Sequence, residues 1–312
     1  MTKTKKVSED GIQIQSLYGG KVEVKFYGPT EDKPNRHMYY VDGVRKTGVT
    51  TYISKLDKSM ALGKWQQGVT AGFLLDLLAK GVKIDEEKAV EAVIQHEIQR
   101  DEAADIGKEI HAWCEHFIRH ELGQKGYEKL PAIPDFKEAV SGVNAFMAWK
   151  DKHKVKFIST ERFVYSKTHN YVGTMDLEAK IDGLHCAGDF KSSNDLYNSV
   201  RMQLAAYVFA DEEERGSKSI YEGRWAIRLS KYTEAEYIKR ETCKIEIKQA
   251  IARFKGQEVK DYEIKPYKVF DAQFLDNDRR MGKKDMDAFL NCKGLYEWDA
   301  ETNGFNRGGT LE

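Results

Sequence analysis

The sequence predicts an α/β fold, a mixed sheet flanked by helices in the order α-β-β-β-α-β. Apolar residues first recur at helical spacing over two stretches. β-forming residues then alternate with polar ones over three successive segments, and the helical period returns once before a last short strand. Helices are expected over 101–122 and 136–153, followed by strands over 157–165, 171–181 and 184–191, a helix over 200–213 and a strand over 224–229.

Hairpin and helical elements are expected before this centre. Asp42-Gly43 favours a tight turn between two short strands, and helical patterns cover about 61–80 and 85–97. The length of 312 residues suits one large domain or two small ones, and only 5 prolines leave no obvious linker. We therefore expect one compact domain in three parts, which are an N-terminal elaboration over 1–100, a core over 101–260 and a C-terminal extension over 261–312.

Composition excludes several classes of protein. The 50 Lys and Arg balance the 50 Asp and Glu, which excludes a polycation but leaves room for a local basic groove. No apolar run approaches the roughly 18–20 residues of a membrane span, and no apolar stretch follows the basic N-terminus as in a secretory signal. The four cysteines stand far apart, which argues against disulfides and zinc knuckles and fits a reducing cytoplasm.

A predicted hairpin brings two acids together. Asp182-Gly183 favours a two-residue turn, and this turn sets Asp176 opposite Asp189 in the paired strands. Side chains opposite each other in an antiparallel pair share a face, with Cβ atoms about 4.5–5.5 Å apart. Alternate residues from Leu177 to Phe190 form an almost wholly apolar face, so Asp176, Asp189 and Lys191 are expected on the other. A shift of two residues would keep the same faces.

Paired carboxylates next to an amine suit a divalent cation. Two carboxylates that close repel each other unless a cation sits between them. Mg²⁺ prefers carboxylate oxygens and keeps several waters, which can attack phosphorus. Lys191, two residues beyond Asp189 on the same face, could hold a hydroxide or a developing phosphorane charge. The competing interpretation is a solvated face on which these three charges form ion pairs.

Two helices add further candidates. His111 lies off the apolar stripe of its helix, one turn after Gly107, whose small size leaves room for a ligand or a close strand. Gln203 and Tyr207 are four residues apart on the later helix and are therefore neighbours in space. For each of these side chains the alternative is an ordinary packed or surface residue.

In chain order these motifs resemble the PD-(D/E)XK nuclease superfamily, and most closely its RecB-like exonuclease branch, which includes phage exonucleases. The likeness covers roughly 103–230. No single motif is specific, but their order on helix, strand, strand and helix is a strong joint signal. The matching segments are Gly107-Lys108-Glu109-Ile110-His111, Gly173-Thr174-Met175-Asp176, Asp189-Phe190-Lys191 and Gln203-Leu204-Ala205-Ala206-Tyr207.

The resemblance implies a restriction-endonuclease-like core that holds Mg²⁺ or Mn²⁺. Its metal ligands would be His111, Asp176, Asp189 and the backbone carbonyl of Phe190. Met175 stands where the superfamily name has proline, which is common in this branch. The cysteine clustering of iron–sulfur relatives is absent from the sequence, so no such cluster is expected.

The resemblance also assigns roles around the metal. Lys191 would orient or activate the attacking water. Glu161, on the first strand, matches a position where the family often has an acid. Gln203 and Tyr207 would contact DNA phosphate or brace the site.

The function implied is a metal-dependent DNA exonuclease that acts in replication, recombination or repair. Its substrate would be single-stranded DNA, or double-stranded DNA with ends, in the cytoplasm of a bacterium or a phage-infected host. A recombination protein or a single-strand-binding protein is a conceivable partner, and no membrane is involved. The alternatives are a structure-specific endonuclease of the same superfamily and a non-catalytic DNA-binding module that retains the fold.

Overall fold

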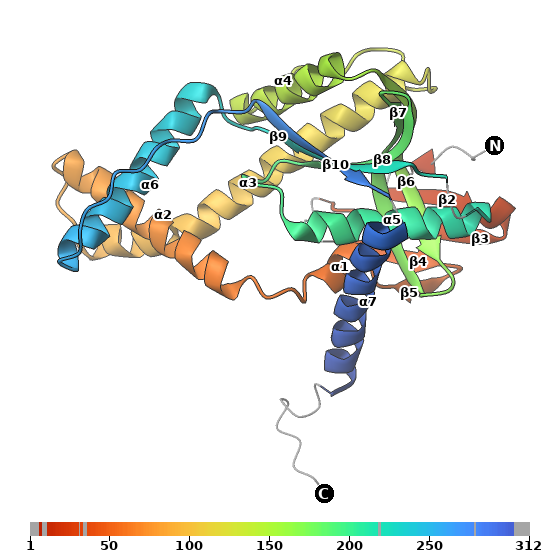
Figure 1. Cartoon of the computed structure of the whole chain (residues 1–312), viewed down its shortest axis with the longest axis horizontal. Helices are drawn as coiled ribbons and strands as arrows, with labels where there is room; N and C mark the ends of the chain where they lie inside the picture. Colours follow the sequence, from red (N-terminus) through yellow and green to blue (C-terminus); the bar gives the residue numbers. More distant parts are fainter. Residues whose placement is uncertain are drawn as a thin grey trace, which may run out of the picture.

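The computed structural model describes residues 6–7, 11–30, 32–33, 36–217, 220–277 and 279–302. It shows an α/β architecture in which a mixed five-stranded sheet is flanked by helices, and a second five-stranded sheet is formed by the N-terminal region (Figure 1). The order α-β-β-β-α-β predicted for the centre of the chain is confirmed.

The central sheet has the strand order β10-β9-β8-β7-β6. Strands β6, β7 and β8 form an antiparallel meander, and α5 (Asn198–Arg215) then crosses over so that β9 runs parallel to β8. Strand β10 pairs antiparallel with β9 at the edge, within the C-terminal extension, where no strand was predicted. The strands are β6 (Val155–Ser166), β7 (Tyr171–Ile181), β8 (Leu184–Lys191), β9 (Gly223–Leu229) and β10 (Phe270–Asp276).

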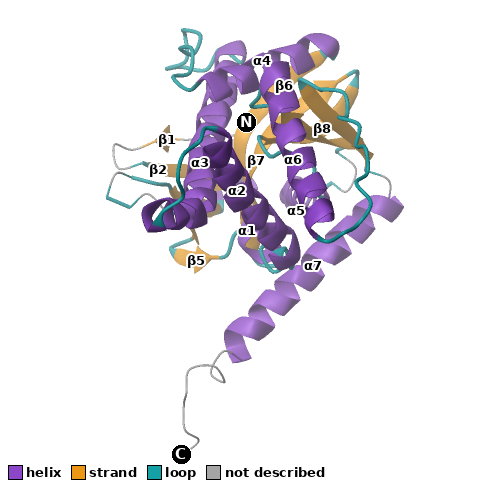
Figure 2. Cartoon of the chain, turned by 90° about the vertical axis from the view of Figure 1, so that its left-hand side faces the viewer, coloured by secondary structure: helices purple, strands orange, loops and turns teal. Residues whose placement is uncertain are grey.

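Two hydrophobic clusters lie on opposite faces of this sheet. Helices α3 (Glu86–Glu121) and α4 (Lys137–Lys152) cover one face, where Trp149 and Phe146 are fully buried. Helices α1 (Val49–Ile53), α5 and α7 (Arg279–Thr302) cover the other face, and α7 extends away from it toward the C-terminus (Figure 2). Each fully buried large apolar side chain stabilises the fold by about 1.5–3 kcal/mol.

Helix α3 is longer than predicted. The sequence suggested separate helices over 85–97 and 101–122, but the structure has one helix of 36 residues. Asp85 caps its start by accepting a hydrogen bond from the Lys88 backbone N–H, and the residues between the two predicted helices include neither glycine nor proline. The boundary expected at residue 100 therefore falls inside this helix.

Helices α2 (Ser59–Ala79) and α6 (Glu234–Phe254) lie side by side beyond the core (Figure 1). Neither contains a buried residue. Helix α6 begins at Glu234, where Thr233 and Glu236 form a reciprocal capping box. No helix in the described ranges has both the length and the apolar character needed to cross a bilayer.

The N-terminal sheet packs on the central one. Its strands follow the chain in order, and the predicted turn at Asp42-Gly43 joins the last two. Leu17, Val24 and Tyr39 from this sheet share a buried cluster with Phe163 and Val172 of the central sheet. The elements are β1 (Lys6–Val7), β2 (Ile12–Leu17), the 3₁₀ turn η1 (Tyr18–Gly20), β3 (Val22–Tyr27), β4 (Met38–Val41) and β5 (Val44–Lys46).

The β7–β8 hairpin has the predicted turn and register. Asp182 and Gly183 have φ values of 52° and 95°, the left-handed conformations that a tight hairpin turn requires. Pairing runs from Ile181 opposite Leu184 to Leu177 opposite Gly188, which is the register deduced from the turn. The pairing ends one step before Asp176 would meet Asp189.

Candidate metal centre

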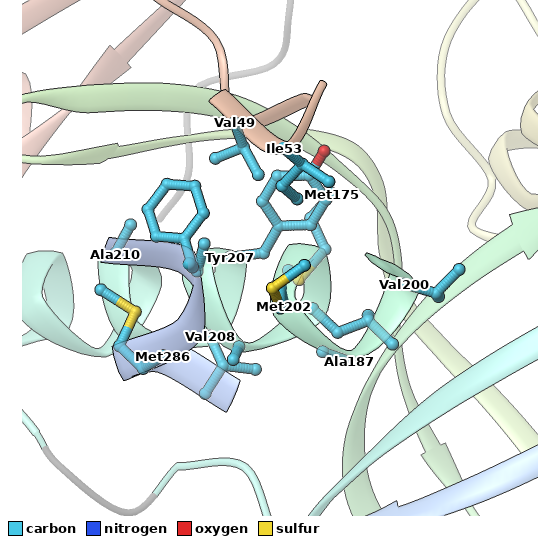
Figure 3. Packing of buried hydrophobic residues seen from close by; sticks show 14 of the residues in the cluster. Val49, Ile53, Met175, Ala187, Val200, Met202, Tyr207, Val208, Ala210 and Met286 are labelled. Carbon is cyan, nitrogen blue, oxygen red and sulfur yellow. The ribbon is translucent and has the colours of Figure 1, made fainter. Parts of the chain in front are cut away.

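The alternation of side chains along β7 changes phase at Asp176. Met175 lies in the buried cluster that also contains Tyr207 of α5 (Figure 3). Glu178, three residues later, faces the same helix, because its carboxylate accepts a hydrogen bond from Arg215. A regular strand would place residues three apart on opposite faces, so the alternation breaks between them.

Strand β6 changes phase at the same level. Ser159 donates a hydrogen bond to Glu178, and Arg162 donates one to Asp211 of α5, so both point to the α5 face although they are three residues apart. Glu161 lies between them with φ of 50°, a left-handed conformation that is strained for a residue with a Cβ. The register of β6 and β7 brings Glu161 opposite Asp176.

This phase change corrects the prediction that Asp176 and Asp189 share one face. The Oδ2 atom of Asp176 lies 3.6 Å from Nδ1 of His111, on α3. The Oδ1 atom of Asp189 instead accepts a hydrogen bond of 2.8 Å from Gln203, on α5. A turn-based register fixes which residues pair but not the alternation beyond an irregularity, and the two acids therefore face different helices.

Three predicted residues converge into one cluster. One ligand atom from each of His111, Glu161 and Asp176 lies within 4.8 Å of the other two. The Phe190 backbone N–H donates a hydrogen bond of 2.9 Å to Asp176 Oδ2, which orients that carboxylate. Two carboxylates and an imidazole at this spacing fit the ligand preferences of Mn²⁺, and of Mg²⁺ through the carboxylates.

A second group of predicted residues lies beside this cluster. Asp189 is fully buried, and the Lys191 ammonium lies 2.6 Å from its Oδ2. Gln203 also donates a hydrogen bond of 3.0 Å to the Tyr207 hydroxyl. Because Gln203 and Tyr207 are both buried, the bracing role is the one that their contacts support.

The electrostatics indicate a shortage of positive charge around Asp176. Burial, followed by the negative charge of Asp189, raises the pKa of Asp176 from 3.8 to about 8, although Lys191 and the Phe190 N–H oppose the shift. Asp189 therefore acts on Asp176 through space, even though it is not a member of the three-residue cluster. A divalent cation would relieve this repulsion.

The two basic side chains of the site, His111 and Lys191, have protonation states that are compatible with a bound cation. Burial, followed by the charge of Lys191, lowers the pKa of His111, so its imidazole is neutral near pH 7 and available as a ligand. Burial alone would lower the pKa of Lys191, but Asp189 and then Asp176 raise it. Lys191 therefore remains an ammonium that can stabilise negative charge.

Sequence reasoning missed the residues that surround these ligands. The Tyr39 hydroxyl, from the N-terminal sheet, lies 2.9 Å from the Thr174 hydroxyl, two residues before Asp176. A Cβ at Gly107 would lie 2.7 Å from the Ser192 hydroxyl, so the glycine admits the end of β8 close to α3. Gly107 was the one sequence signal for this second contact.

No protein-family model matches the chain, and no curated protein matches it. Each predicted site residue nevertheless lies in or beside the cluster. His111, Glu161 and Asp176 form it, Phe190 orients Asp176, and Lys191 approaches Asp189. The functional interpretation therefore depends on geometry and chemistry.

Proposed function

We propose that the protein is a Mg²⁺- or Mn²⁺-dependent deoxyribonuclease that hydrolyses phosphodiester bonds. The observation that carries this proposal is the cluster of His111, Glu161 and Asp176, placed beside the Asp189–Lys191 ion pair. A cation site alone has many uses. A cation site next to a half-buried ammonium suits the handling of a negatively charged phosphate group.

His111, Glu161 and Asp176 would hold the cation. A bound divalent cation lowers the pKa of water and neutralises the charge of a phosphate oxygen. Lys191 stays protonated and supplies a fixed positive charge beside the reacting phosphate. Gln203 and Lys191 hold the Asp189 carboxylate from two sides, and Tyr207 supports Gln203. These buried contacts preorganise the site without solvent reorganisation.

The topology supports assignment to a restriction-endonuclease-like core, within the RecB-like branch of the PD-(D/E)XK superfamily. The three antiparallel strands, the crossover helix α5 and the parallel strand β9 follow the order that this assignment predicts. The candidate ligands come from α3, β6 and β7, and the D-x-K segment ends β8. Helix, strand, strand and helix thus carry the motifs in the expected succession.

Within this class we propose exonucleolytic cleavage, in DNA replication, recombination or repair. Helices α2 and α6 extend beyond the core and offer an element that could restrict the site to DNA ends. The alternative, a structure-specific endonuclease, keeps the same chemistry. Supercoiled circular DNA separates the two, because an exonuclease leaves it intact and an endonuclease nicks or linearises it.

The deciding experiment measures Mg²⁺- and Mn²⁺-dependent release of nucleotides from linear single-stranded and double-stranded DNA. Wild type should release nucleotides, Asp189→Asn should not, and Asp151→Asn, at an exposed position of α4, should behave as wild type. Equal activity of Asp189→Asn and wild type would reject the site. Binding without cleavage of any DNA form would favour a non-catalytic DNA-binding module.

The direction of cleavage follows from the same assay with end-labelled DNA. Oligonucleotides that carry a 5′ or a 3′ label release the label first from the end at which digestion begins. Adding a recombination protein or a single-strand-binding protein then shows whether either changes the rate.

A further inference from the structure

A group of cationic and aromatic side chains lies where β9 leaves the sheet. Arg228 of β9 pairs with Lys191 of the parallel strand β8, so both strands end at the same edge as the candidate site. Lys231 follows three residues later, in the loop that leads to α6 (Figure 1). It therefore lies beyond the C-terminal end of β9, past the level at which Arg228 pairs with Lys191.

Two cations of this group share one aromatic ring. The Lys231 ammonium lies 5.7 Å from the centre of the Tyr232 ring, and the guanidinium carbon of Arg240 lies 4.2 Å from the same centre. Lys231 is only 8% exposed. Among the described residues, no carboxylate oxygen lies within 4.0 Å of either cationic group. Lysine is rarely buried to this extent unless it is paired.

The acids that face this group are already engaged. Glu236 lies 2.6 Å from the Lys137 ammonium, and Glu138 lies 3.9 Å from it. Burial, followed by the charge of Arg240, lowers the pKa of Lys231, and the more distant Glu138 opposes this shift only in part. Two neighbouring cations that repel each other, one of them buried, favour the binding of an anion beside them.

We propose that Lys231 and Arg240 form a subsite that binds a phosphate group of the nucleic-acid strand, distinct from the phosphate at the metal centre. The inference deepens the proposed nuclease function and rests on it for the identity of the strand. Arginine and lysine are the side chains that most often contact DNA phosphates, and the Tyr232 ring holds both in place through cation–π contacts. Because Lys231 lies past the level of Lys191, this phosphate would be one beyond the scissile phosphate.

The test measures binding of a fluorescein-labelled oligothymidine, about 12 nucleotides long, in EDTA, so that no cleavage interferes. Removing one cation that neutralises a phosphate should reduce the slope of log K against log salt concentration by about 0.7. We expect Arg240→Gln and Lys231→Gln each to weaken binding about three- to tenfold at low salt and to reduce this slope. Lys239→Gln removes an exposed charge from the neighbouring position of α6 and should change neither quantity.

Arg240 is only half-buried, so Arg240→Gln guards against failure of Lys231→Gln to fold, which a melting curve reveals. If Arg240→Gln and wild type give the same slope of log K against log salt concentration, the proposed subsite is wrong, whether or not the protein cleaves DNA. Reduced slopes without any metal-dependent cleavage would leave the subsite in place and reject the nuclease function. The two proposals therefore fail through different measurements.

Discussion

Asp176 and Glu178 stand two residues apart on β7 and have opposite electrostatic surroundings. Glu178 accepts hydrogen bonds from Arg215, His185 and Ser159 at 2.8–2.9 Å. Burial would raise the pKa of Glu178, but Arg215, Ser159 and His185 together lower it. Burial and the charge of Asp189 raise the pKa of Asp176 to about 8. Glu178 therefore has several hydrogen-bond donors, whereas Asp176 lacks enough positive charge nearby to favour its ionised form.

This difference separates a structural ion network from a site. The network around Glu178 continues through Arg215 and Asp211 to Arg162, so each buried charge has an opposite partner within the chain. The acids around Asp176 face a neutral imidazole, and the nearest ammonium is bound to Asp189. A buried acid without sufficient counter-charge is a better indicator of a cation site than the presence of acids alone.

The largest expected effect is on catalysis. Asp176→Asn should reduce metal-dependent nucleotide release by about three orders of magnitude or more, because the proposed cation then has one charged ligand fewer. Glu178→Gln should retain activity within about tenfold of wild type when assayed at a temperature where it is folded. Initial rates on linear DNA at saturating Mn²⁺ provide the comparison. Similar losses in both variants would erase the distinction between the two acids.

The next largest effect is on stability, where Glu178→Gln should do more damage than Asp176→Asn. Glu178→Gln should lower the free energy of unfolding by about 3 kcal/mol, because Arg215 and His185 lose a buried partner. Asp176→Asn should not destabilise the metal-free protein, because burial and Asp189 disfavour the ionised form of Asp176 and asparagine has no ionised form. Urea unfolding in EDTA measures both. A metal-free Asp176→Asn less stable than Glu178→Gln would contradict the assigned electrostatics.

The two acids should also give opposite pH dependence. Asp176 has a folded-state pKa above its unfolded value of 3.8, so its stabilising contribution is complete below about pH 4 and is lost as the pH rises toward about 8. Glu178 has a depressed pKa, so its contribution is present above its unfolded value of 4.5 and is lost on acidification. Between pH 5 and 8, the stability of wild type relative to Asp176→Asn should fall by up to about 1.4 kcal/mol per pH unit. A flat difference in EDTA would show that Asp176 is already ionised.

The smallest effect concerns Tyr207 and Gln203, which hold the Asp189 carboxylate in place. A Cβ at Gly173 would lie 2.4 Å from the Tyr207 ring, which supports Gln203. Gly173→Ala should therefore cost about 1–2 kcal/mol of stability through overpacking and slow cleavage about tenfold by shifting the Gln203–Asp189 contact. Gly294→Ala, on α7 with open space around the added atom, is the control. Unchanged cleavage by Gly173→Ala would show that the brace does not affect the chemistry.

Local chemistry explains the parts of this site that could be predicted. The Asp182-Gly183 turn is a short-range signal, and it was sufficient to deduce the register of β7 and β8. Helical spacing placed His111 on α3 and Gln203 with Tyr207 on α5. The convergence of these residues on one site was implied by the resemblance to the RecB-like branch, and not by the spacing within any one segment.

The phase change at Glu161 and Asp176 could not be predicted, because it depends on tertiary packing. A glutamate with φ of 50° in the middle of a strand has no composition signal, since glycine or asparagine usually occupies such positions. The pairing of β10 with β9 likewise depends on contacts between distant segments. The faces assigned by simple alternation were therefore reliable only near the turn.

The most direct test of the contrast between the two acids is Mn²⁺ binding without DNA, measured by isothermal titration calorimetry. Wild type and Glu178→Gln should bind Mn²⁺ with similar affinity, and Asp176→Asn should bind at least about tenfold more weakly because a charged ligand is missing. Affinity of Asp176→Asn equal to that of wild type would contradict the account, since the buried acid would then have no part in holding a cation.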